Sequence, residues 1–509
     1  MAQPFVMDSR IRSMAVFVPA LILAVWIASE AASEEFLIPM VATIGFVGLV
    51  VFSVFVQSVR FETAALNMLM IGYLVGNRGF ADITIAKPLY PGEVVMVAVI
   101  LAIGARYILT RELPDFSGAL ARTILIFLIL GGVRLASDYQ TYRLDAVRDS
   151  AMVYYAVYFF FGRQMIKGEE SRAVLEKCLK FSLLALVPIS IIERVAPELF
   201  MSNGMFMTVL YQKDDLVTTF AAVMVFVLYT RPHIFRQRWL RPALIIFYIV
   251  FIFAGITRAS LAGLAVGSVL LLIAGRRQFL VYPAVAGFLG VTVLAGFSVT
   301  FEGSQTTDLN ATVDKLYSMV DFTGDHEYSS DVGRLKSDNN RFRRELWQSF
   351  VDDTNEASPT FGRGFGYDFM ARFEGSASAD QGGLRSAHNF YVTLYGRLGI
   401  IGTLVLLAIT YQVAAAGIRA AVAVRRGEQP FADLAFWCGA WAILTSAVFG
   451  VVLEGPVGAI IFWLFLGIGV RAGQSAAEER AWLAAQEPEL PEIEPVPRPR
   501  LAGAMARAR

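Results

Sequence analysis

His388 is the residue of this sequence best suited to proton transfer. It lies beside Asn389 in the stretch SAHNFYVTLYGRLGIIG, at the start of a long apolar segment. An unperturbed imidazole titrates at about pH 6.5 and so can accept or return a proton near neutrality. The other histidines, His233 and His326, lie in a predicted cytoplasmic loop and in a polar turn. A histidine at the start of a helix more often caps or packs, so both interpretations stay open on spacing alone.

Basic side chains are the second group that could do chemistry. Several lie at predicted external ends of apolar segments, although Lys and Arg normally gather at the cytoplasmic ends. Nearby carboxylates such as Asp138, Asp145 and Asp149 offer ion pairs for some of them. Arg258 and Arg397 have no acid close in sequence, and a planar guanidinium suits phosphate. The group therefore suggests a diphosphate ligand, and its members are Arg134, Arg143, Arg148, Arg194, Lys213, Arg258, Arg341, Arg343, Arg344 and Arg397.

The composition places these residues in a membrane protein. The chain is 56% hydrophobic and 17% charged, which is too apolar for a soluble chain of 509 residues. A helix crosses a bilayer with about 20 mostly apolar residues, because lipid offers its backbone no hydrogen-bond partners. We predict an all-α polytopic fold with about 12 to 14 such spans. They lie near residues 11–28, 36–57, 61–77, 90–109, 118–137, 149–167, 173–195, 214–230, 240–257, 259–275, 279–298, 388–420, 431–452 and 456–472.

The distribution of basic residues orients these spans. Clusters at residues 163–180, 231–241, 276–277 and 425–426 all fall on one side, which we assign to the cytoplasm together with both termini. The predicted organisation is a transmembrane block over 1–298, a periplasmic loop domain over 299–387, a second transmembrane block over 388–472 and a disordered cytoplasmic tail over 473–509. Apolar residues at helical spacing predict two short helices within the loop, at 310–320 and 340–353.

Several classes of site are excluded or disfavoured. The two cysteines, Cys178 and Cys438, lie in different predicted spans, which excludes a thiol metal site and a disulfide framework. The chain has no Asp-x-Asp motif, so we expect neither a metal nor another cofactor. The formal net charge is only +1, and we expect no nucleic-acid partner.

Four motifs, taken together, resemble the O-antigen ligase and polymerase superfamily of bacterial envelope enzymes. His388 and Asn389 are followed by nine residues and then by GIIG at 399–402. The run GITRAS around Arg258 is similar to the family's Ser/Thr-Arg turn, and RFRRELWQSF is similar to its Arg-containing helix that ends in Trp. GRGFGYDF resembles the glycine-rich loop before the histidine. The order of the motifs also agrees, and the resemblance covers roughly residues 190 to 450.

This resemblance implies a GT-C-like glycosyltransferase of the bacterial inner membrane with a periplasmic active site. Such an enzyme moves a glycan from an undecaprenyl-diphosphate-linked donor to an acceptor hydroxyl. His388 would be the general base with Asn389 beside it, and Arg258 would neutralise the departing diphosphate in place of a metal. Either Arg341 or Arg343 would assist Arg258, and the spacing to Trp347 favours Arg343. Further candidates for binding the diphosphate are Arg148, Arg194 and Lys213.

The acceptor is open at this point. A polysaccharide polymerase adds repeat units to a glycan, an O-antigen ligase uses lipid A core, and a protein O-oligosaccharyltransferase uses a protein hydroxyl. The alternative to an enzyme is a transporter or flippase of lipid-linked sugars. The charged residues gather at the external ends of the spans and not at mid-membrane, which favours an enzyme. We also expect contacts with membrane lipids and with partners in a polysaccharide assembly pathway.

Overall fold

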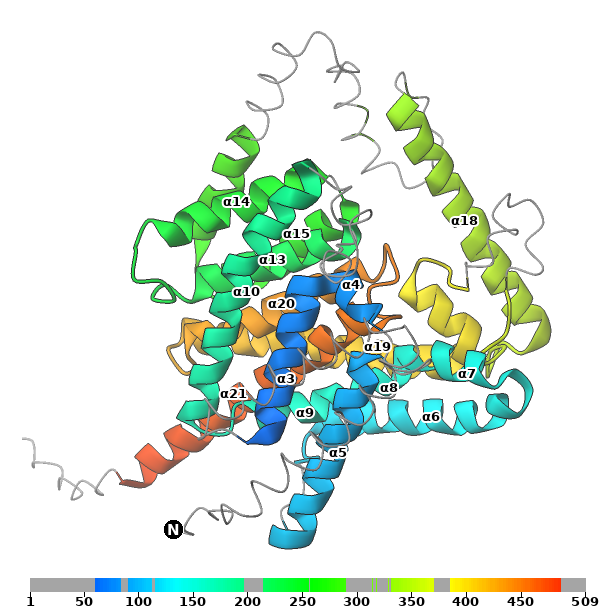
Figure 1. Ribbon diagram of the computed structural model, residues 1–509, viewed down its shortest axis with the longest axis horizontal. Helices are drawn as coiled ribbons and strands as arrows, with labels where there is room; N and C mark the ends of the chain where they lie inside the picture. The colour runs from blue at the N-terminus through cyan, green and yellow to red at the C-terminus, as the bar shows by residue number, and fades with distance from the viewer. Residues whose placement is uncertain are drawn as a thin grey trace, which may run out of the picture.

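The computed structural model describes residues 60–83, 90–111, 115–195, 214–255, 257–289, 331–369 and 385–486, and the single positions 314, 317 and 328. Their regular elements are all helices (Figure 1). The first half of the chain forms α3 (Phe61–Ile71), η1 (Gly72–Gly76), α4 (Asn77–Ala81), α5 (Pro91–Thr110), α6 (Ala119–Tyr142), α7 (Leu144–Asp149), α8 (Ala151–Tyr154), η2 (Tyr155–Val157), α9 (Tyr158–Met165) and α10 (Glu169–Val195). The second half forms α13 (Asp214–Thr230), α14 (Leu240–Gly255), α15 (Arg258–Ile273), η3 (Arg277–Leu280), α18 (Asp331–Ala357), α19 (Phe390–Arg425), η6 (Phe431–Asp433), α20 (Leu434–Ser446) and α21 (Pro456–Gln486).

The predicted spans coincide with these helices wherever they fall on described residues. Within that part of the chain, four helices are long and apolar enough to cross a membrane, namely α5, α6, α19 and Pro456–Leu483 of α21. Further apolar helices are shorter, such as those at Arg258–Ile273 and Leu240–Phe253. The expected all-α polytopic membrane fold is thereby confirmed. The spans at 11–28 and 36–57 lie outside the described residues.

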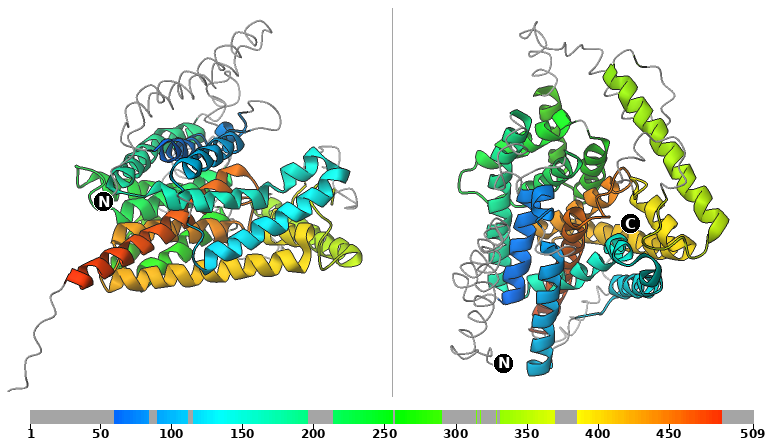
Figure 2. Two further views of the ribbon diagram at one scale, coloured as in Figure 1. Left: turned by 90° about the horizontal axis from the view of Figure 1, so that it is seen from below. Right: turned by 45° about the vertical axis from the view of Figure 1, so that its right-hand side comes forward.

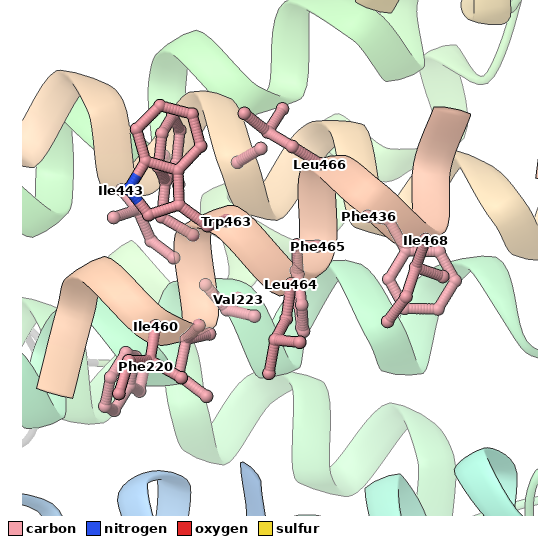
Figure 3. Packing of buried hydrophobic residues seen from close by; sticks show 14 of the residues in the cluster. Phe220, Val223, Phe436, Ile443, Ile460, Trp463, Leu464, Phe465, Leu466 and Ile468 are labelled. Atoms are coloured by element: carbon pink, nitrogen blue, oxygen red, sulfur yellow. The ribbon is translucent and has the colours of Figure 1, made fainter. Parts of the chain in front are cut away.

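A buried helical core supports the rest of the fold. Phe220 and Val223 of α13 are fully buried, as are Phe465 and Leu466 of α21. Figure 3 shows side chains from α13, α20 and α21 packed together around them. By contrast, α5 and α19 turn apolar residues outward, for example Ile108, which is 73% exposed. Such a face requires a lipid environment, because water would make it unfavourable.

Two helices extend beyond the predictions. α18 runs for 27 residues and includes the short helix that we expected at 340–353. Its first turns, DVGRLKSDNN, carry no apolar repeat that could reveal a helix. α21 reaches Gln486, so residues 473–486 of the expected disordered tail are helical. That segment is rich in Ala and Glu, which favour helix, and Arg471 pairs with Glu478 at 2.8 Å.

α18 and α19 define the end of the molecule that carries the candidate site. α19 lies along α6, and Gln412 of α19 donates a hydrogen bond to the Thr123 hydroxyl at 2.8 Å. Figure 2 shows α18 at the edge of the helical bundle, with its C-terminal half near the start of α19. Leu346 and Phe350 of α18 are buried there against Phe369 and Ala387. The polar helix is therefore anchored by one apolar stripe beside His388.

Candidate active site

The segment before α19 holds His388 in an unusual backbone conformation. His388 has φ of 53°, in the left-handed region that few residues other than glycine occupy. Its N–H donates to the Ser386 hydroxyl at 3.0 Å. The imidazole is half-buried. Strained backbone of this kind is frequent at functional sites, which makes this segment a candidate for function.

Asn389 has a clear structural role. Its side-chain oxygen accepts hydrogen bonds from the backbone N–H groups of Tyr391 and Val392, at 3.0 and 3.3 Å. The residue is buried and forms the N-cap of α19. These contacts cap α19 directly after His388, and a catalytic role for Asn389 stays a prediction.

α18 contacts this segment through one face. Trp347 donates from Nε1 to the carbonyl oxygen of Ala387 at 2.7 Å. Arg343, one helical turn earlier, donates from Nη1 to the carbonyl oxygen of Phe449 at 2.8 Å. Arg341 instead pairs with Asp338 at 2.7 Å and is exposed. The structure thus brings Arg343 to the His388 segment and directs Arg341 away from it.

The turn that follows α20 connects three distant parts of the chain. The Ser446 hydroxyl donates to the carbonyl oxygen of Ala259 at 3.0 Å, next to Arg258 at the start of α15. The carbonyl oxygen of Ala447 accepts from the N–H of Phe390 at 3.0 Å, two residues after His388. Since Phe449 binds Arg343, residues 446–449 hold the segments that carry Arg258, Arg343 and His388.

Hydroxyl groups fix the start of α15. Thr257 lies 2.9 Å from the Thr218 hydroxyl of α13, and Ser260 donates to that same hydroxyl at 2.6 Å. Thr219 donates to Ser446 at 3.2 Å, which extends the network to α20. The Thr and Ser of the GITRAS run therefore position the half-buried Arg258 by binding Thr218 of α13.

The glycine-rich loop after α18 fits into a break in α19. Gly399 has φ of 61° and ψ of −158°, so the helical hydrogen-bond pattern is interrupted there. The loop replaces the lost bonds, since Arg363 N–H donates to the Gly396 carbonyl and Ile400 N–H donates to the Pro359 carbonyl, both at 2.8 Å. A Cβ at Gly399 would collide with the backbone of Thr360. The GIIG motif is thus explained by close approach of the backbone.

Arg397 is held by an ion pair that the sequence did not reveal. Its Nη2 lies 2.8 Å from Oδ2 of Asp149, at the end of α7, and its guanidinium is 1% exposed. Asp149 also accepts from the Gly366 N–H at 2.8 Å and lies 3.3 Å from Arg385. Arg397 further donates to the carbonyl oxygens of Gly364, Tyr367 and Arg385. No acid lies close to Arg397 in sequence, and its partner is 248 positions earlier in the chain, which agrees with a structural role for this arginine.

Three further candidates for the diphosphate site stay predictions. Arg148 is exposed on α7. Arg194 lies on α10, where the structure does not describe its side chain, and Lys213 lies outside the described residues. Across the described ranges, no group of three or more His, Cys, Asp and Glu side chains could hold a metal ion.

Comparison with known families decides the relationship suggested by the four motifs. Residues 243–407 match the family model described as O-antigen ligase. This match supports the resemblance of the chain to the O-antigen ligase and polymerase superfamily over that segment. The match includes Arg258, Arg343 and His388 and runs through the GIIG break in α19. A comparison with curated proteins found no match.

Glu454 lies beyond the matched O-antigen ligase segment, and the sequence analysis missed it. Its Oε1 accepts from the Thr393 hydroxyl at 3.0 Å, and that hydroxyl in turn accepts from the Ala387 N–H at 3.1 Å. Burial raises the pKa of Glu454 to about 7, and the charge of Asp149 adds to this increase. Hydrogen bonds from Ser386 and Thr393 and the positive charge of Arg397 lower the pKa, but they do not offset the effect of burial. One signal was available, since Glu454 is the sole charged residue between positions 434 and 470.

The raised pKa of Glu454 predicts a pH-dependent contribution to stability. Its folded pKa of about 7 exceeds the ordinary value of 4.5, so the buried group favours folding in its protonated form. This contribution is fully present below pH 4.5 and is lost as the pH rises through 7. The melting temperature of the wild type, relative to that of Glu454→Gln, is therefore expected to fall between about pH 5 and pH 8. A difference that stays constant over this range would contradict the assignment.

Proposed function

We propose that this protein is a glycosyltransferase of the bacterial inner membrane. It transfers a glycan from an undecaprenyl-diphosphate-linked donor to an acceptor hydroxyl at the periplasmic face. The observation that carries the proposal is the attachment of three segments to residues 446–449, which brings the elements of Arg258, Arg343 and His388 together. The O-antigen ligase match over residues 243–407 supports the same class of reaction.

The proposed chemistry assigns one task to each type of side chain. The imidazole of His388 removes the proton of the acceptor hydroxyl while the hydroxyl oxygen bonds to the anomeric carbon of the donor. The bond from that carbon to the diphosphate oxygen breaks, and the electron pair leaves with the diphosphate. Arg258 and Arg343 stabilise the negative charge that develops on the leaving group. The side chains of Arg148, Arg194 and Lys213 are proposed to bind the same anion.

Charge at the ends of the helices supports the periplasmic placement. α15 begins at Arg258 and ends shortly before Arg276 and Arg277. α19 begins next to His388 and ends at Arg425 and Arg426. Because basic residues favour the cytoplasmic side, both helices direct the His388 end to the periplasm. In this orientation both termini are cytoplasmic.

The proposal covers two activities, that of an O-antigen ligase and that of a polysaccharide polymerase, with lipid A core or a glycan as the acceptor.

The test uses the purified protein in nanodiscs with an undecaprenyl-diphosphate-linked glycan and a glycan acceptor. We expect a glycosylated acceptor and free undecaprenyl diphosphate in equal amounts, at a rate that EDTA leaves unchanged. Movement of an intact donor across the bilayer without release of diphosphate would instead establish a transporter. A product formed only on a protein hydroxyl would identify a protein O-oligosaccharyltransferase.

In the same assay, the two loop arginines should behave differently. Arg343→Ala is expected to lower the transfer rate by about a hundredfold or more, because it removes a cation that stabilises the leaving group. Arg341→Ala should change the rate by less than about threefold, because its exposed ion pair with Asp338 contributes less than about 1 kcal/mol. Equal losses in the two variants would contradict the choice of Arg343. Melting temperatures establish that both variants are folded.

A further inference from the structure

A cavity lies at the opposite end of the bundle from His388. Its volume is about 900 Å³, and it is formed by the ends of α13 and α14, residues 276–285 and the connection between α19 and α20. α15 separates the two ends, and its 16 residues span about 24 Å. This cavity is therefore independent of the proposed catalytic site.

The lining of the cavity is cationic and aromatic. Arg276 places Cζ 4.5 Å from the centre of the Phe431 ring, and Arg241 places Cζ 6.0 Å from that of Tyr229. Both arginines line the cavity, and none of its lining residues in the described part of the chain is Asp or Glu. Nε of Arg241 has no hydrogen-bond partner among the described residues. Two guanidinium groups near a tyrosine side chain form a suitable environment for a phosphate ester.

One wall of the cavity continues into an apolar outer surface. Val281 and Val285 line the cavity, and they are 59% and 40% exposed. They lie one turn apart in the helical stretch 281–289, in which Phe288 is 73% exposed. A ligand that contacts both the arginines and this surface must join an anionic group to a hydrocarbon chain. A soluble anion would leave the apolar wall uncovered.

We propose that this cavity binds the headgroup of an anionic phospholipid of the cytoplasmic leaflet. Arg241 and Arg276 contact the phosphate, the hydroxyl group of Tyr229 is placed as a further hydrogen-bond donor, and an acyl chain follows Val281 and Val285. Basic pockets between membrane helices on the cytoplasmic side bind such lipids through the same combination of charge and apolar contact. The assignment to the cytoplasmic leaflet rests on the orientation given above. The match between the residues of the cavity and an anionic lipid does not depend on that orientation.

The test measures lipid binding to the purified full-length protein in detergent. Phosphatidylglycerol is expected to raise the melting temperature at concentrations where phosphatidylcholine and inorganic phosphate do not. The double variant Arg241→Gln/Arg276→Gln should bind phosphatidylglycerol roughly thirtyfold more weakly. Arg277→Gln is the matched control, because it removes a neighbouring charge that does not line the cavity, and it should bind like the wild type.

Three outcomes would overturn the proposal. They are equal stabilisation by phosphatidylcholine, equal stabilisation by inorganic phosphate, and unchanged binding by the double variant. If the double variant fails to fold, Arg241→Lys/Arg276→Lys replaces it, because lysine keeps the charge but loses the bidentate geometry. Weakened binding by the lysine variant supports the site, and unchanged binding overturns the role of the guanidinium groups.

Discussion

Replacement of His388 by asparagine is expected to lower glycan transfer by about a hundredfold to ten-thousandfold, the usual contribution of a general base. The protein should remain folded, because asparagine tolerates the left-handed backbone that His388 adopts at φ of 53°. His388→Ala should lose activity to the same extent and be less stable than His388→Asn by roughly 1 kcal/mol, because alanine lacks the polar side chain with which asparagine stabilises the left-handed conformation. The measurement is release of undecaprenyl diphosphate, with melting temperature recorded for each variant.

The control for His388 is another histidine of the same chain. His233 is exposed in the turn between α13 and α14, at the opposite end of the bundle from His388. His233→Asn should leave the transfer rate unchanged within about twofold, as expected for an exposed site away from the reaction. If His388→Asn retains wild-type activity, the proposed general base is wrong. If His388→Asn and His233→Asn lose activity to the same extent, the loss in His388→Asn does not come from removal of a general base.

The sequence predicted the helices because each one carries its own signal. The apolar run of α13 fixes its position without reference to any other element, and Phe220 and Phe226 are buried as expected for a central span. The polar start of α18 has no such signal, which explains why its full length was missed. Lipid-facing and protein-facing apolar residues are equally hydrophobic, so the sequence did not indicate which spans form the core.

The candidate site was predictable in its residue types but not in its connections. His388, Arg258 and the alternatives Arg341 and Arg343 came from motifs, and each lies in the segment matched by the O-antigen ligase family model. Arg343, however, contacts the backbone carbonyl of Phe449, and a carbonyl has no residue-specific signature. The pairing of Asp149 with Arg397 is also invisible, because 248 positions separate the two residues. Contacts between distant segments require the tertiary structure.

Removal of the Asp149 carboxylate is expected to destabilise the protein strongly. Asp149→Ala would leave the guanidinium of Arg397, which is 1% exposed, without its 2.8 Å partner. Loss of one member of a buried ion pair typically costs about 3 to 5 kcal/mol, since the remaining charge is neither solvated nor neutralised. The Gly366 N–H would also lose its acceptor, so the glycine-rich loop should detach from α7. We expect a large decrease in melting temperature and little folded protein.

Asp145→Ala separates this effect from ordinary loss of surface charge. Asp145 pairs with Arg385 at 2.8 Å, but its side chain is 55% exposed, so its removal should cost less than about 1 kcal/mol. Adding Arg397→Met to Asp149→Ala removes the unpaired charge and should restore part of the lost stability. If Asp149→Ala is no more destabilising than Asp145→Ala, the buried pair does not hold α7 against α19. If Arg397→Met restores nothing, the cost arises instead from the lost contacts with Gly366 and Arg385.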